Sequence, residues 1–107
     1  MTEITFNLYN STYIFECKGH TGYSARGSDI LCSAVSVLCY TLKDLLEDME
    51  ATGRIYRLIC DFHDGMAIIE FSPASEKDIS LLEAVEALLR GFRILGEGYP
   101  EYITADV

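Results

Sequence analysis

Two apolar runs separated by a short turn occupy the middle of the chain, where the sequence reads Ile55-Tyr56-Arg57-Leu58-Ile59-Cys60-Asp61-Phe62-His63-Asp64-Gly65-Met66-Ala67-Ile68-Ile69-Glu70-Phe71. The segments 55–62 and 66–71 have the length and the aromatic and β-branched content of strands. His63-Asp64-Gly65 is a strong hairpin signal, because Asp-Gly adopts the tight turn whose twist matches paired strands. Pro73 ends the second run. This stretch therefore predicts a β-hairpin.

A second hairpin is predicted at the N-terminal end. Apolar and polar residues alternate through Ile4, Phe6 and Leu8, which is the pattern of a half-buried strand. Asn10-Ser11 supplies a turn, and a second strand is expected from about Thr12 to Lys18. One face of that strand carries Tyr13, Phe15 and Cys17.

The segment between the hairpins predicts a loop and then a helix. Three glycines and several small polar residues make 19–28 a mobile loop, long for so small a domain, and such loops are often functional. Ser28 or Asp29 can cap the helix, and Gly53 ends it. Apolar residues at helical spacing form its inner stripe, namely Leu31, Val35, Leu38, Leu42, Leu45 and Met49.

A second helix is predicted after the central hairpin. Ser75-Glu76-Lys77-Asp78 resembles a capping box with Asp in place of Glu, and the helix is expected to run to about Leu95, before Gly96 and Gly98. Its expected inner residues are Ile79, Leu82, Val85, Leu88, Leu89 and Phe92. The segment 99–103 is extended and could form an edge strand.

These elements predict an α+β fold in the order β-β-α-β-β-α, with a short C-terminal strand possible. Two hairpins forming one sheet would be covered on one face by two helices. At 107 residues the chain is expected to be a single domain spanning residues 1–107.

Composition narrows the classes of function. The chain has 17 acidic residues against 8 Lys and Arg, a net charge of -9, and 50% hydrophobic residues. We expect no nucleic-acid binding, which needs clustered basic residues, and no membrane span. Without a signal peptide at its start, the chain is expected in the cytoplasm, where its four cysteines would be reduced. Cys17, Cys39 and Cys60 are expected to be ordinary core residues.

The segment 19–36 joins a histidine in the glycine-rich loop to a cysteine in the first turn of the helix. If Asp29 is the cap, Cys32 lies beside unpaired backbone N–H groups, where the helix dipole favours an anion. His20 could take the thiol proton, which is the Cys–His arrangement of nucleophilic catalysis. Asp29 could orient His20, although as a cap it would be occupied by the backbone. Ser36, one turn on, could support the site or merely hydrogen-bond its own helix.

Two other classes of function fit parts of this pattern. Cys17-x-x-His20 has the spacing of metal ligands, and Cys32 and His63 could complete a set. Structural zinc sites normally show two close pairs, and the chain has no second one, so we expect no metal and no cofactor. A non-catalytic acidic module that binds a basic protein, or assists its assembly, is the second alternative.

The whole segment Gly19-His20-Thr21-Gly22-Tyr23-Ser24-Ala25-Arg26-Gly27-Ser28-Asp29-Ile30-Leu31-Cys32-Ser33-Ala34-Val35-Ser36 closely resembles the signature of the ribosomal-processing cysteine protease family, called Prp. The family has Gly-His, Tyr-Ala, Gly, Asp-Ile-Val-Cys and Ala-Ala-Val-Ser at this spacing, without gaps. Tyr99-Pro100-Glu101-Tyr102 also resembles the family's C-terminal ending. Where the family usually has Ala, this chain has Thr21, Ser24 and Ser33, and where the family usually has Val, it has Leu31.

The resemblance implies a homodimeric cysteine endopeptidase that removes the short N-terminal extension of a large-subunit ribosomal protein, after an aromatic pair. It places His20 and Cys32 on the family's catalytic dyad. Asp29 and Ser36 are candidate supporting residues. Gly19, Gly22 and Gly27 are candidate hinges of a loop that is open without substrate and is ordered over a docked peptide.

Overall fold

The structure, a computed structural model, describes residues 1–25 and 27–107, which form five strands and two helices. The elements are β1 (Thr2–Tyr9), β2 (Thr12–Lys18), α1 (Ile30–Ala51), β3 (Ile55–His63), β4 (Met66–Pro73), α2 (Ile79–Gly98) and β5 (Ile103–Asp106). This order confirms the predicted α+β fold and its short C-terminal strand. Arg26, which belongs to the predicted loop 19–28, lies outside the described residues.

The two predicted hairpins lie side by side in one sheet with the order β3-β4-β2-β1-β5. Neighbouring strands are antiparallel, except that β5 runs parallel to β1 at the edge. The β2–β4 pairing joins the hairpins and sets Lys18 opposite Met66. This register brings the end of β2 beside the turn between β3 and β4, where the site described below begins.

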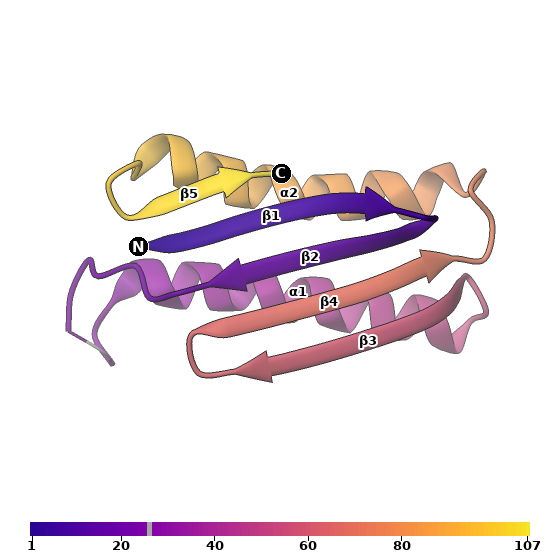
Figure 1. Cartoon of the computed structure of the whole chain (residues 1–107), viewed down its shortest axis with the longest axis horizontal. Coiled ribbons are helices and arrows are strands. Elements are labelled where there is room, and N and C mark those ends of the chain that lie inside the picture. The colour runs from indigo at the N-terminus through magenta and orange to yellow at the C-terminus, as the bar shows by residue number, and fades with distance from the viewer. Residues whose placement is uncertain (26) are drawn as a thin grey trace.

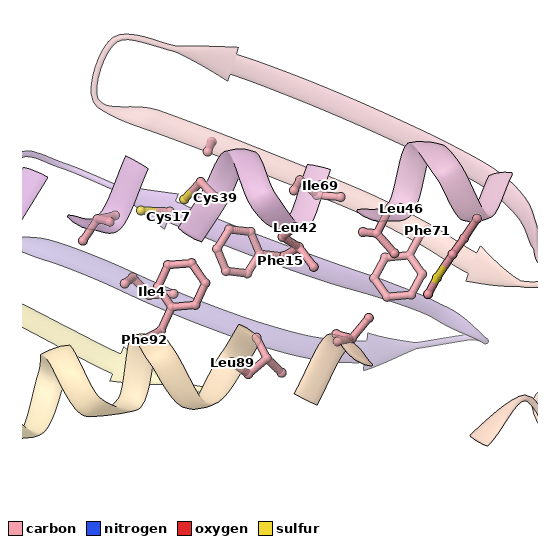
Figure 2. Close-up of a cluster of buried hydrophobic side chains, with 14 of the residues drawn as sticks. Ile4, Phe15, Cys17, Cys39, Leu42, Leu46, Ile69, Phe71, Leu89 and Phe92 are labelled. Carbon is pink, nitrogen blue, oxygen red and sulfur yellow. The ribbon is translucent and has the colours of Figure 1, made fainter. Parts of the chain in front are cut away.

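Both helices lie behind the sheet in Figure 1, with α1 behind β2 and β4 and α2 behind β1 and β5. The core fills the space between the layers, and in Figure 2 Phe15 and Phe92 meet across it with ring centroids 5.2 Å apart. Buried apolar residues alternate along the strands, as in Ala67, Ile69 and Phe71 of β4. Neither α1 nor α2 is long and apolar enough to cross a membrane, within the residues described.

The buried face of α1 matches its predicted stripe in part. Leu31, Val35, Leu42 and Met49 are buried as expected. Leu38 and Leu45 are only partly buried, and Cys39 and Leu46 take the central positions. A stripe of Leu residues cannot show which side of the stripe points most directly at the sheet.

The predicted start of α2 was wrong. Asp78 is itself the N-cap and accepts from the N–H of Leu81, so the helix begins further along the chain than a cap at Ser75 would place it. Arg54 fixes Asp78 with two hydrogen bonds of 2.9 Å, a contact that local sequence cannot reveal. Ile79 therefore stands at the first helical position and is 61% exposed instead of buried. The fully buried residues of α2 are Leu81, Val85, Leu89 and Phe92.

Candidate active site

Cys32 lies in the first turn of α1, as the sequence predicted. Of the two predicted capping residues, Asp29 is the N-cap, and its Oδ1 accepts from the N–H of Cys32 at 2.9 Å. The thiol is half-buried. Its place in the first turn puts it at the positive end of the α1 dipole.

The loop before α1 folds back onto the helix start through the other oxygen of Asp29. Thr21 Oγ1 donates to Asp29 Oδ2 at 2.6 Å, and the N–H groups of Tyr23 and Ser24 donate to the same oxygen at 3.0 and 3.2 Å. Burial would raise the pKa of the Asp29 carboxyl, but these hydrogen bonds, with those from the helix, lower it from 3.8 to about 2. The carboxylate thus stays ionised and holds the loop in place.

Thr21 also touches the sulfur. Its N–H donates to Cys32 Sγ at 3.5 Å, and its hydroxyl lies 3.5 Å from the same atom. The residue directly after His20 is therefore in contact with the thiol, which brings the predicted His and Cys to one site. The contacts of Asp29 are with Thr21 and backbone N–H groups, whereas His20 has the carboxylate of Asp64 at 3.7 Å.

A cavity of about 790 Å³ opens at this point, between the loop, α1 and the turn from β3 to β4. His20, Cys32 and Ser36 all line it. Its apolar wall includes Tyr40 and Phe62, whose ring centroids are 5.0 Å apart. An elongated ligand placed there would meet the thiol, an imidazole and an aromatic surface together.

The three loop glycines differ in their surroundings, although all have positive φ, at +92° for Gly19, +72° for Gly22 and +91° for Gly27. A Cβ atom at Gly19 would lie 2.4 Å from the carbonyl oxygen of Met1, whereas Gly22 and Gly27 face open space. Gly19 and Gly27 line the cavity. Gly19 is thus required by close packing as well as by its backbone conformation.

Several residues at the site were missed in the sequence. Thr21 was noted only as a departure from the family pattern, and Asp64 and Gly65 only as a turn. Tyr23 packs edge-on against Tyr99 and Tyr102, with centroids 6.0 and 5.2 Å apart, and so ties the loop to the C-terminal segment. These tyrosines belong to the two segments that resemble the family, 19–36 and 99–102. Their contact could not be predicted, because it depends on where β5 lies in the sheet.

All four cysteines are free thiols, and Cys17 and Cys39 line the same cavity as Cys32, whereas Cys60 does not. Cys17 and Cys39 are buried, as predicted, and lie close together in Figure 2. A hydrogen bond with Cys17 and burial both raise the pKa of Cys39. Cys60 is half-buried, and burial raises its pKa. Within the described part of the chain, no three His, Cys, Asp or Glu side chains gather as a set that could hold a metal ion.

A match to a protein family identifies the family of the chain. The model of the family described as cysteine protease Prp matches residues 1–104. The chain belongs to the Prp cysteine protease family. This confirms the resemblance seen in segment 19–36, and it makes the protein a cysteine protease.

Solved structures share the fold of this Prp family member. SMU.848 from Streptococcus mutans is 29% identical with a TM-score of 0.65, covering 99% of this chain and 92% of that one. An essential ribosomal processing protease Prp from S. aureus, with a covalently linked product peptide, is 15% identical with a TM-score of 0.69, covering 99% and 98%. The same S. aureus protease with a substrate peptide is 15% identical with a TM-score of 0.63, covering 97% and 96%. No curated protein sequence matches the chain.

Proposed function

We propose that the protein is an endopeptidase that removes the short N-terminal extension of a large-subunit ribosomal protein, with Cys32 as nucleophile and His20 as general acid and base. One observation carries this assignment. The residue after His20 contacts Cys32 Sγ, while both side chains line the same cavity at the start of α1. The solved S. aureus relatives, ribosomal processing proteases with substrate and product peptides, support a peptide of this origin as substrate.

The chemistry follows the Cys–His pattern. His20 takes the proton of Cys32, and the thiolate attacks the scissile carbonyl carbon to give a tetrahedral oxyanion. The C–N bond then breaks, His20 gives its proton to the leaving amine, and a thioester remains. A water molecule that loses its proton to His20 hydrolyses the thioester and restores the thiol.

The oxyanion needs donors near the sulfur. The N–H of Cys32 donates to Asp29 Oδ1, so it is less suited to this task. The N–H of Thr21 points at the sulfur and is the donor that we assign to the oxyanion. Asp29 supports the site by holding Thr21, and Ser36 contributes to the cavity wall.

The charge of the chain suits such a substrate. Ribosomal proteins are generally basic, and a net charge of -9 would attract a basic precursor during encounter. We extend the proposal to a homodimer acting in the cytoplasm, where the precursor is made.

The test uses the extended ribosomal protein precursor, with its cleavage followed by intact-mass spectrometry. Cys32→Ala and His20→Ala should abolish cleavage and leave the circular dichroism spectrum unchanged. Cys60→Ala, at a half-buried cysteine outside the cavity wall, should cleave like the wild type. Cleavage by Cys32→Ala would refute the assignment. Wild-type protein that binds the precursor without cleaving it would favour the non-catalytic binding module instead.

A further inference from the structure

The turn between β3 and β4 supports His20 directly. The N–H of Gly19 donates to the carbonyl oxygen of Gly65 at 2.8 Å, which extends the β2–β4 pairing by one contact beyond Lys18 and Met66. The residue that follows, His20, is thereby placed over the turn. The turn of a hairpin that is distant in the sequence thus lies against the imidazole.

Gly65 leaves the space that the imidazole occupies. A Cβ atom at Gly65 would lie 2.9 Å from Nε2 of His20 and 3.4 Å from its Cδ2. The φ of Gly65 is +73°, so glycine is favoured here by the turn as well. The imidazole ring therefore rests against the backbone of the turn, with its Nε2 edge toward the turn.

Asp64 presents a carboxylate to that edge. Its Oδ1 lies 3.7 Å from Nε2 of His20, whereas Asp29 is engaged by Thr21 and backbone N–H groups. We propose that Asp64 is the positioning residue of this protease: it accepts from Nε2–H of His20 and leaves Nδ1 free to exchange the proton with Cys32. This inference rests on the proposed function.

The charge change during catalysis gives Asp64 a second effect. When His20 takes the thiol proton it becomes an imidazolium, and a carboxylate at this distance stabilises it. In the free protein the two side chains are 43% and 66% exposed, so water screens the pair. A peptide in the cavity excludes part of that water, and hydrogen bonds of catalytic groups tighten in the complex. The effect of Asp64 should therefore fall on kcat more than on KM.

A matched control exists on the same hairpin. Asp61 and His63 form a second Asp–His pair at 2.7 Å, also exposed, and Asp61 does not line the cavity. The experiment compares Asp64→Ala, Asp64→Glu and Asp61→Ala with the wild type. It measures kcat and KM on a peptide that spans the cleavage site, and the ¹⁵N shifts of the His20 ring nitrogens at a pH where the ring is neutral.

We expect Asp64→Ala to lower kcat about 10-fold, because the general base His20 is no longer held in position. KM should change less than about 2-fold. Asp64→Glu should recover part of that loss, and Asp61→Ala should match the wild type. The wild-type His20 should be the Nε2–H tautomer, and Asp64→Ala should remove this preference. An unchanged kcat in Asp64→Ala, or an equal loss in Asp61→Ala, would overturn the inference.

The two proposals fail in different ways. If the wild type does not cleave the peptide, the proposed function fails, and the ring shifts still report whether Asp64 fixes the His20 tautomer. If the wild type cleaves and the tautomer is the same with and without Asp64, the function stands and the role of Asp64 is wrong.

Discussion

The hydroxyl of Thr21 donates to the Asp29 carboxylate across 2.6 Å, and both side chains are buried. Thr21 follows His20 in the loop, and Asp29 caps the helix that carries Cys32. One short hydrogen bond therefore links the two halves of the proposed dyad. Prp family members usually have Ala at this position, so the hydroxyl is an addition in this chain.

Thr21→Val removes the hydroxyl but keeps the shape of the side chain. It therefore tests the hydrogen bond to Asp29 without changing the packing of the loop. We expect kcat/KM to fall about 3- to 10-fold and the Tm to fall by about 5 °C, since a buried charged acceptor loses a donor. Thr12→Val is the control, because Thr12 bonds Ser72 far from the cavity. Equal activity losses in both variants would argue against a role for the Thr21 hydroxyl at the site.

The acid stability of the protein should depend on Asp29. Its pKa is lowered from 3.8 to about 2, so the folded state favours the ionised carboxyl. This stabilisation is present above pH 3.8 and is lost as the pH falls toward 2. Urea unfolding from pH 5 to 2 should therefore show a decline in unfolding free energy that Asp29→Asn makes shallower.

Asp78 provides the control for that measurement, because it caps α2 away from the cavity. Its hydrogen bonds with Arg54 and with the N–H of Leu81 also lower its pKa. Asp78→Asn should likewise make the decline of the unfolding free energy between pH 5 and 2 shallower. A second measurement, the rate at which iodoacetamide alkylates Cys32, should be unchanged in Asp78→Asn. Asp29→Asn should change both the decline and the alkylation rate. If Asp29→Asn keeps the full decline between pH 5 and 2, the assignment of the ionised cap is wrong.

Local signals in the sequence predicted the elements well. Asp64-Gly65 and Asn10-Ser11 were recognised as turns, because turn chemistry is set by neighbouring residues. Asp29 was among the predicted caps of α1 for the same reason. By contrast, Arg54 holds Asp78 from the connection between α1 and β3, and so the start of α2 was placed too early.

The candidate site was predictable only to the extent that it is continuous in the sequence. His20 and Cys32 lie within one segment that also carries the family signature. Asp64 comes from the other hairpin, and its place beside His20 depends on β4 pairing with β2. Strand order is a long-range property, and neither hairpin sequence specifies its neighbour in the sheet.

Gly19 and Gly22 should respond differently to the same substitution. Gly19→Ala would set a Cβ atom 2.4 Å from the Met1 carbonyl oxygen, which forces β1 and the loop apart. We expect its Tm to fall by about 10 °C or more and its activity to be lost. A Cβ atom at position 22 would contact nothing, so Gly22→Ala should lower the free energy of unfolding only through its positive φ, by about 1 kcal/mol. Thermal unfolding followed by circular dichroism compares them, and a Gly19→Ala protein as stable as Gly22→Ala would contradict the packing argument.

Tyr23 should hold the loop to the C-terminal segment. Its ring meets Tyr102 edge-on at 5.2 Å, and such pairs contribute about 0.5–1.5 kcal/mol beyond their buried area. Tyr23→Ala should therefore speed amide hydrogen exchange at residues 22–24 by about 3- to 10-fold and lower kcat/KM, because Thr21 and His20 belong to the same loop. Tyr23→Phe, which keeps the ring, should behave like the wild type.

The control for this contact is Tyr56→Ala, because Tyr56 lies on β3 and is 82% exposed. Tyr102→Ala should reproduce the faster exchange of the loop, and the double variant of Tyr23 and Tyr102 should add little to either single one, since both remove one shared contact. Hydrogen–deuterium exchange with mass spectrometry measures the five variants and the wild type under one condition. Additive effects in the double variant would show that the two tyrosines act independently, and Tyr102 would then not hold the His20 loop through Tyr23.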